Sequence, residues 1–94
     1  MSEETTELQL PKMACKVISQ KGTCAFGHTE GQTFDMEGGT PVGMCPAAFH
    51  AIYPSAYGLM FGAVFPWEPD KDAAQIACPD GANPVIFEVR RLPE

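Results

Sequence analysis

The middle of this 94-residue chain contains no charged residue between Glu37 and Glu68, and prolines and glycines interrupt it repeatedly. Proline inside a helix removes a backbone donor and clashes with the preceding turn, so it ends or kinks the helix. An uncharged segment of this length belongs in the core of a small domain, folded in short pieces. We expect two short helices, over residues 46–53 and 54–61. Their predicted buried faces contain Phe49, Ile52, Tyr53, Tyr57, Met60 and Phe61.

Residues 47–65 are nearly long enough to cross a membrane, which requires about twenty apolar residues. Pro54 at the centre, His50, and acidic flanks without nearby Lys or Arg oppose that interpretation. The N-terminus shows no basic region followed by an apolar one, as a signal peptide would. We therefore expect a cytoplasmic protein with no membrane partner, whose four cysteines are thiols.

On both sides of the middle, apolar residues alternate with polar ones, the pattern of half-buried strands. The predicted strands cover residues 13–17, 32–36, 74–78 and 85–89. Residues 79–84 between the last two are rich in turn formers and predict an antiparallel hairpin. The expected fold class is α+β: an antiparallel sheet in β-β-α-α-β-β order, with two short proline-punctuated helices on one face.

Charge is distributed unevenly along the chain. Glu3, Glu4 and Glu7 predict a flexible acidic tail over residues 1–11, followed by a single domain over residues 12–94. The net charge is −6 and the six basic residues are scattered, so we expect no nucleic-acid partner. The uncharged middle, together with Ile86 on an outer strand face, leaves more apolar surface than one sheet face can bury. We therefore predict a homodimer.

Several motifs together resemble a family of short, uncharacterised prokaryotic proteins, often found in anaerobes and sometimes labelled as repeat proteins. The motifs are Cys15-Lys16-Val17, Gly27-His28-x-x-Gly31-Gln32-x-Phe34, Pro41-x-Gly43-x-Cys45-Pro46-x-Ala48, Phe65-Pro66-Trp67 and Cys78-Pro79-Asp80 followed by Asn83-Pro84-Val85-x-Phe87-Glu88. The resemblance covers the chain after Lys12 and implies no agreed activity. It implies that three cysteines and His28 stand at motif positions. Many members of the family have a longer insertion before the position of Cys24.

Four residues form a candidate metal set. Cys24, Cys45 and Cys78 fall at the ends of predicted elements, and Cys24-x-x-x-His28 is a plausible ligand spacing. If Cys24, His28, Cys45 and Cys78 converge, they offer a tetrahedral site for zinc or ferrous iron. The alternative is three reduced, separately packed thiols. Cys15 lies within a strand and is expected to be a buried apolar residue.

Two further residues are candidates for a ligand site. His50 either makes satisfied contacts within the fold or contributes to ligand binding. Trp67 either covers the core or forms the wall of a shallow site. Three functions follow from these candidates. We favour an interaction or small-ligand-binding module; the alternatives are a metal-binding or redox accessory protein and an enzyme with Cys45 as nucleophile and His28 or His50 as base.

Overall fold

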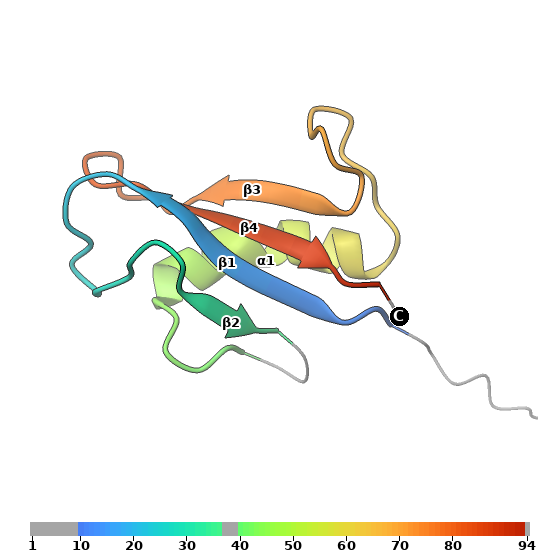
Figure 1. Ribbon diagram of the computed structural model, residues 1–94, viewed down its shortest axis with the longest axis horizontal. Coiled ribbons are helices and arrows are strands. Elements are labelled where there is room, and N and C mark those ends of the chain that lie inside the picture. The colour runs from blue at the N-terminus through green and yellow to red at the C-terminus, as the bar shows by residue number, and fades with distance from the viewer. Residues whose placement is uncertain (1–9, 37–39, 94) are drawn as a thin grey trace, which may run out of the picture.

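The computed structural model describes residues 10–36 and 40–93. Within them the fold is a four-stranded antiparallel sheet covered on one face by one helix (Figure 1). The elements are β1 (Met13–Gln20), β2 (Thr33–Asp35), α1 (Pro46–Met60), β3 (Ala73–Ala77) and β4 (Val85–Arg91). The strands lie in the order β2-β1-β4-β3. The predicted α+β class and antiparallel sheet are confirmed.

The central strand pair is built from the alternation seen in the sequence. Cys15 lies opposite Val89 and Val17 opposite Phe87, and all four side chains are buried. Alternate residues of a strand point to opposite faces, so the same alternation turns Lys16 outward. The register shifts after Val17, where β1 contains an irregularity typical of a β-bulge. The predicted inner faces of the first and last strands are therefore confirmed.

The prediction of two helices is wrong, because residues 46–60 form one continuous helix with Pro54 inside it. Pro54 has no N–H to donate to the carbonyl of His50, four residues earlier. Both residues are exposed, so water can replace the missing hydrogen bond. Pro46 opens the helix at its first turn, where a missing N–H costs little. The free energy gained by burying one face of α1 outweighs the remaining cost of Pro54 within the helix.

The buried face of α1 also differs from the predicted one. Ile52 is buried as predicted, but Tyr53, Tyr57 and Phe61 are exposed. The buried positions of α1 are Ala48, Ile52, Ala56 and Leu59. Two of these are alanines, which let the helix backbone lie close to the sheet and leave no room there for aromatic rings. Tyr53, Tyr57 and Phe61 consequently lie exposed beside the buried face, while Phe49 is partly buried against the core.

Arg91 joins the C-terminal end of α1 to the sheet. Its guanidinium donates hydrogen bonds to the backbone carbonyls of Leu59 and Ala63, both at 2.9 Å, and to that of Lys71. It also pairs with the carboxylate of Asp72 at 3.2 Å. The last carbonyls of a helix lack intrahelical donors, so one side chain at the end of β4 supplies what the helix end needs.

The predicted acidic tail lies mostly in residues 1–9, outside the described residues. In the part of the chain that the structure does describe, no helix has the length and hydropathy needed to cross a membrane.

Candidate functional site

Three cysteines and one histidine from distant parts of the sequence line a single small cavity of about 110 Å³. Cys24 and His28 come from the β1–β2 connection, Cys45 from the start of α1, and Cys78 from the position directly after β3. These segments gather at one end of the molecule (Figure 1). The structure thus brings the four predicted residues to one place, which we call the cysteine pocket.

His28 is buried, with 2% of its surface exposed, and both ring nitrogens are occupied. Nδ1 lies 2.9 Å from Oε1 of Gln32, an acceptor, so Nδ1 carries the ring proton. Nε2 then accepts the backbone N–H of Cys45 at 3.0 Å. The ring also makes edge contacts with Phe34 and Phe87. In this arrangement His28 holds the β1–β2 connection against the start of α1.

Cys24 lies in a tight turn whose backbone surrounds its sulfur. The N–H of Gly27 donates to the carbonyl of Cys24 at 3.0 Å and closes the turn. Slight burial raises the pKa of the Cys24 thiol, but hydrogen bonds from the backbone N–H groups of His28, Gly27 and Phe26 lower it further than burial raises it. The net effect is a pKa below the ordinary thiol value, which favours the nucleophilic thiolate.

The other two cysteines of the pocket occupy the ends of regular elements. The sulfur of Cys78 accepts the backbone N–H of Val85 at 3.2 Å, and the Cys78 N–H donates to the Val85 carbonyl at 2.9 Å. Cys45 is the N-cap residue of α1, where backbone N–H groups favour negative charge. The sulfur of Cys78 therefore has a backbone donor, whereas the side chain of Cys45 makes no capping hydrogen bond.

The wall of the pocket is held together by contacts between two loops. Thr23 donates its N–H to Oδ1 of Asn83 at 3.2 Å, and Lys21 donates its N–H to the carbonyl of Pro84 at 3.0 Å. Gly22 has a φ of +73°, and a Cβ at this position would collide with the Asn83 side chain. The residues before Cys24 are therefore fixed against the β3–β4 turn, which begins at Cys78.

The arrangement does not provide a preformed metal centre. In the described ranges, no group of three or more His, Cys, Asp or Glu side chains is placed to hold a metal ion. The imidazole would have to give up its bond to the Cys45 N–H before Nε2 could bind a metal. Zinc or ferrous iron on Cys24, His28, Cys45 and Cys78 therefore stays a prediction, and metal binding there would require rearrangement of the pocket.

Cys15 lies apart from the pocket, in the sheet core as expected. Burial of its sulfur, aided by the negative charge of Glu88, raises its pKa to about 12. Cys15 is thus an internal reference for an unreactive thiol in the same chain.

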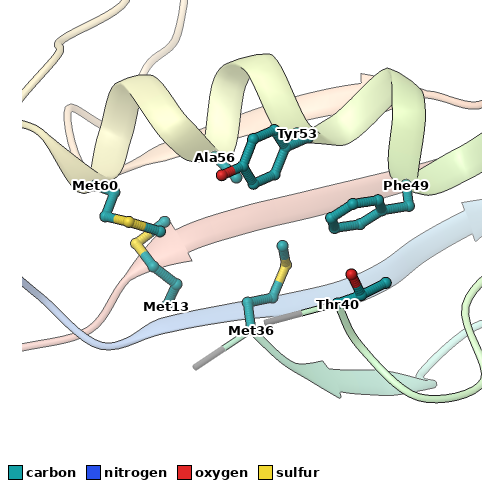
Figure 2. A pocket seen from close by; sticks show the side chains of 7 residues that line it. All are labelled: Met13, Met36, Thr40, Phe49, Tyr53, Ala56 and Met60. Atoms are coloured by element: carbon teal, nitrogen blue, oxygen red, sulfur yellow. The ribbon is translucent and has the colours of Figure 1, made fainter. Parts of the chain in front are cut away.

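A second cavity lies between α1 and the edge of the sheet formed by β1 and β2 (Figure 2). It measures about 360 Å³, and we call it the methionine groove. Its lining residues are Met13, Met36, Thr40, Phe49, Tyr53, Ala56 and Met60. Three thioether side chains from separate segments meet here, and Phe49 and Tyr53 extend over it from α1. Nothing in the local sequence around any single methionine indicated this convergence.

Beside the groove, four aromatic rings follow one another along α1 at intervals of four residues. The ring centroids are separated by 5.3 Å for Phe49–Tyr53, 5.7 Å for Tyr53–Tyr57 and 5.0 Å for Tyr57–Phe61. Tyr53 is 42% exposed, and Tyr57 and Phe61 are each 53% exposed. We call these four residues the aromatic ladder. The spacing was visible in the sequence, but these rings were assigned to the buried face.

The two predicted ligand-site residues lie outside both cavities. His50 is exposed on α1 and lines neither the cysteine pocket nor the methionine groove. Trp67 is 73% exposed and stacks on Phe65, with ring centroids 5.2 Å apart. Phe65 in turn packs against the core, so Trp67 is a surface side chain rather than a cover over the core.

Comparison with family models, curated proteins and solved structures gives no match to this chain. The resemblance carried by the sequence motifs stays a prediction.

Proposed function

We propose that this protein is a non-enzymatic interaction module that binds an apolar surface of a protein partner through α1. The observation that carries this proposal is the aromatic ladder. Its three outer rings are about half exposed, on a helix that contains no charged residue. Contiguous apolar surface of this kind is uncommon on a monomeric protein and marks interaction sites.

The chemistry of the surface favours a protein partner. Tyrosine, phenylalanine and methionine are enriched in protein interfaces, and tyrosine adds a hydroxyl that can hydrogen-bond across the contact. The flexible thioethers of the methionine groove adapt to side chains of varied shape. The groove continues from the ladder through Phe49 and Tyr53, so a partner lying along α1 could insert an apolar side chain there.

A second copy of this chain is the partner that we propose. The chain carries a net charge of −6, which opposes self-association over most surfaces. The ladder lies within the uncharged span between Glu37 and Glu68, so two copies could meet there without placing acids opposite each other. A two-fold arrangement would place each ladder against the groove of the other copy.

A catalytic function for Cys45 has less support. A nucleophilic thiol needs a base within hydrogen-bond reach of its sulfur. The acceptor nitrogen of His28, Nε2, already accepts the backbone N–H of Cys45, so it is not available to the Cys45 sulfur. His50 is exposed on α1. The geometry therefore supports a structural function for His28 rather than that of a base.

Sedimentation equilibrium at high micromolar concentration tests the proposal. We expect a dimer for the wild type and a monomer for Tyr57→Glu, which introduces a charge at the middle of the ladder. Gln75→Glu is the matched control, because it adds the same charge at an exposed position of β3 and should leave the dimer intact. A monomeric wild type, or a dimer that survives Tyr57→Glu, would contradict the proposal.

A further inference from the structure

The interaction proposed for α1 does not involve the cysteine pocket. Three thiols share one cavity of about 110 Å³ there, although they are far apart in the sequence. Cys24, Cys45 and Cys78 are all free and all partly exposed. Their exposure makes them accessible to small reagents, which Cys15 is not.

We propose that Cys24 and Cys78 form a covalent modification site, at which Cys24 reacts with a small hydroperoxide and Cys78 then converts the product into an intramolecular disulfide. The first step is assigned to Cys24 because this thiol lines the cavity from a turn in which the neighbouring residues Thr23 and Ala25 are exposed, so a small peroxide can reach it. The sulfur of Cys78 instead accepts the N–H of Val85 beside the sheet. The thiolate is the form of a cysteine that attacks a peroxide.

Cys78 is assigned to the second step because the segment before Cys24 is attached to the β3–β4 turn. The hydrogen bonds Thr23–Asn83 and Lys21–Pro84 join these two loops on either side of Gly22. Asp80 and Cys24 line the same cavity. Asp80 lies two positions after Cys78, so the two sulfurs flank the same junction.

Cys45 reaches the pocket from a different direction. It is the N-cap of α1, and its backbone is fixed by the bond to His28 Nε2. Bringing its sulfur onto Cys24 would pull the start of α1 away from His28. Cys78 follows the end of β3 and precedes a turn, so a small backbone adjustment there disturbs less of the fold.

The chemistry of the two steps balances. The Cys24 thiolate attacks the peroxide, an S–O bond forms as the O–O bond breaks, and the released alkoxide or hydroxide takes a proton. Cys24 is thereby oxidised to a sulfenic acid, and the hydroperoxide is reduced to an alcohol or water. The Cys78 thiolate then attacks the Cys24 sulfur, an S–S bond forms, the S–O bond breaks, and hydroxide leaves as water after taking a proton. Together, two thiols and one hydroperoxide give one disulfide, one alcohol and one water.

Peptide mapping of the reduced full chain after treatment with equimolar hydrogen peroxide tests the proposal. Remaining thiols are alkylated before digestion without reductant, and dimedone is added in parallel to trap sulfenic acid. We expect one intramolecular Cys24–Cys78 disulfide in the wild type, while Cys15 and Cys45 stay alkylated. Cys24 should be consumed at least about tenfold faster than Cys15.

Three variants, each checked for native circular dichroism, separate the two steps. Cys78→Ser should accumulate dimedone-labelled Cys24, and Cys24→Ser should form no intramolecular disulfide. Cys45→Ser is the matched control and should form the same disulfide as the wild type. A Cys24–Cys45 disulfide, a disulfide without Cys24, or four intact thiols after excess peroxide would overturn the assignment. If a variant fails to fold, the peptide map of the wild type alone tests the assignment of the disulfide to Cys24 and Cys78.

Discussion

The Nε2 atom of His28 accepts the backbone N–H of Cys45 at 3.0 Å, although the two residues are seventeen positions apart. In a capping box, the N–H of the N-cap residue is accepted by a Glu or Gln side chain at the third position of the helix, which in α1 is Ala48. The N-cap of α1 is a cysteine that makes no side-chain capping bond in the described structure. The buried imidazole therefore fixes the chain just before α1 from a preceding loop, and it belongs to the framework of the fold.

Replacement of His28 should destabilise the fold strongly. His28→Ala would remove two hydrogen bonds and the ring contacts with Phe34 and Phe87. We expect the free energy of unfolding to fall by about 3 kcal/mol, measured by urea denaturation. His50→Ala on the exposed side of α1 is the control and should change it by less than about 0.5 kcal/mol. Equal effects of the two changes would refute the framework function of His28.

Replacement of Arg91 should loosen the other end of α1. Arg91→Met keeps much of the side-chain volume but removes the guanidinium donors to the carbonyls of Leu59 and Ala63, of which the Leu59 carbonyl keeps the Gly62 N–H at 3.2 Å. We expect a loss of about 2 kcal/mol in the free energy of unfolding. Arg90→Met is the matched control, since it removes a partly exposed ion pair with Asp70 and should cost less than about 1 kcal/mol. If both variants unfolded at the same urea concentration, Arg91 would be an ordinary surface cation.

Removal of the proline inside α1 should stabilise the protein. Pro54→Ala restores an N–H that can donate to the carbonyl of His50, and alanine favours the helical conformation. The unfolded chain becomes more flexible, which offsets part of the gain. We expect a net increase of about 1 to 2 kcal/mol in the free energy of unfolding, together with unchanged or higher helix content by circular dichroism. A decrease would show that Pro54 makes a contact that the helix needs.

Stability should fall in alkaline solution because of Cys15. Its pKa is raised to about 12 in the folded protein, whereas an unfolded cysteine ionises near its ordinary value of 9.0. The folded state therefore binds the thiol proton of Cys15 more tightly than the unfolded state does. The contribution of Cys15 to the free energy of unfolding is complete below pH 9 and is lost as the pH rises towards 12. We expect a decline of up to about 1.4 kcal/mol per pH unit from this group.

Urea denaturation at pH 8 and pH 10.5 measures that decline. Other groups titrate in the same range, so the informative quantity is the difference between the wild type and Cys15→Ala. The variant should be less stable at pH 8, because it leaves a cavity, but it should lose less stability between the two pH values. Parallel pH profiles for the two proteins would assign the alkaline loss to other groups.

The strands could be predicted from the sequence because burial on one face imposes a period of two. Val17 and Phe87 show this clearly, since each is buried next to a charged residue, Lys16 or Glu88, on the opposite face of the sheet. The single continuous helix was harder to predict from the sequence. The known effects of proline describe its local cost in free energy within a helix, and not the burial against the sheet that offsets this cost. Pro54 is tolerated on account of its exposed position, and exposure could not be known before the orientation of α1 was known.

The orientation of α1 was mispredicted for a related reason. Hydrophobicity alone ranks Tyr57 and Phe61 above Ala48 and Ala56 as core residues. The sheet instead takes the small side chains, and the rings lie outside. At the candidate site, the positions of Cys24, Cys45 and Cys78 at element ends left open whether they converge or pack separately, and the structure places all three in the lining of one cavity. The two hydrogen bonds of His28 could not be predicted, because no local pattern specifies partners four and seventeen positions away.

The pairing of β1 with β4 has a consequence for how this chain acquires its structure during synthesis. The two central strands of the sheet are the first and the last elements of the described residues, and β1 makes most of its cross-strand pairs with β4. A ribosome-bound intermediate that ends before β4 therefore lacks the main partner of β1 and one of the strands against which α1 packs. Such an intermediate would expose part of the apolar face of α1 that the complete sheet buries. The complete sheet is accordingly expected to form only once β4 has been synthesised, and chaperones that hold apolar segments would have their greatest effect on this protein before that point.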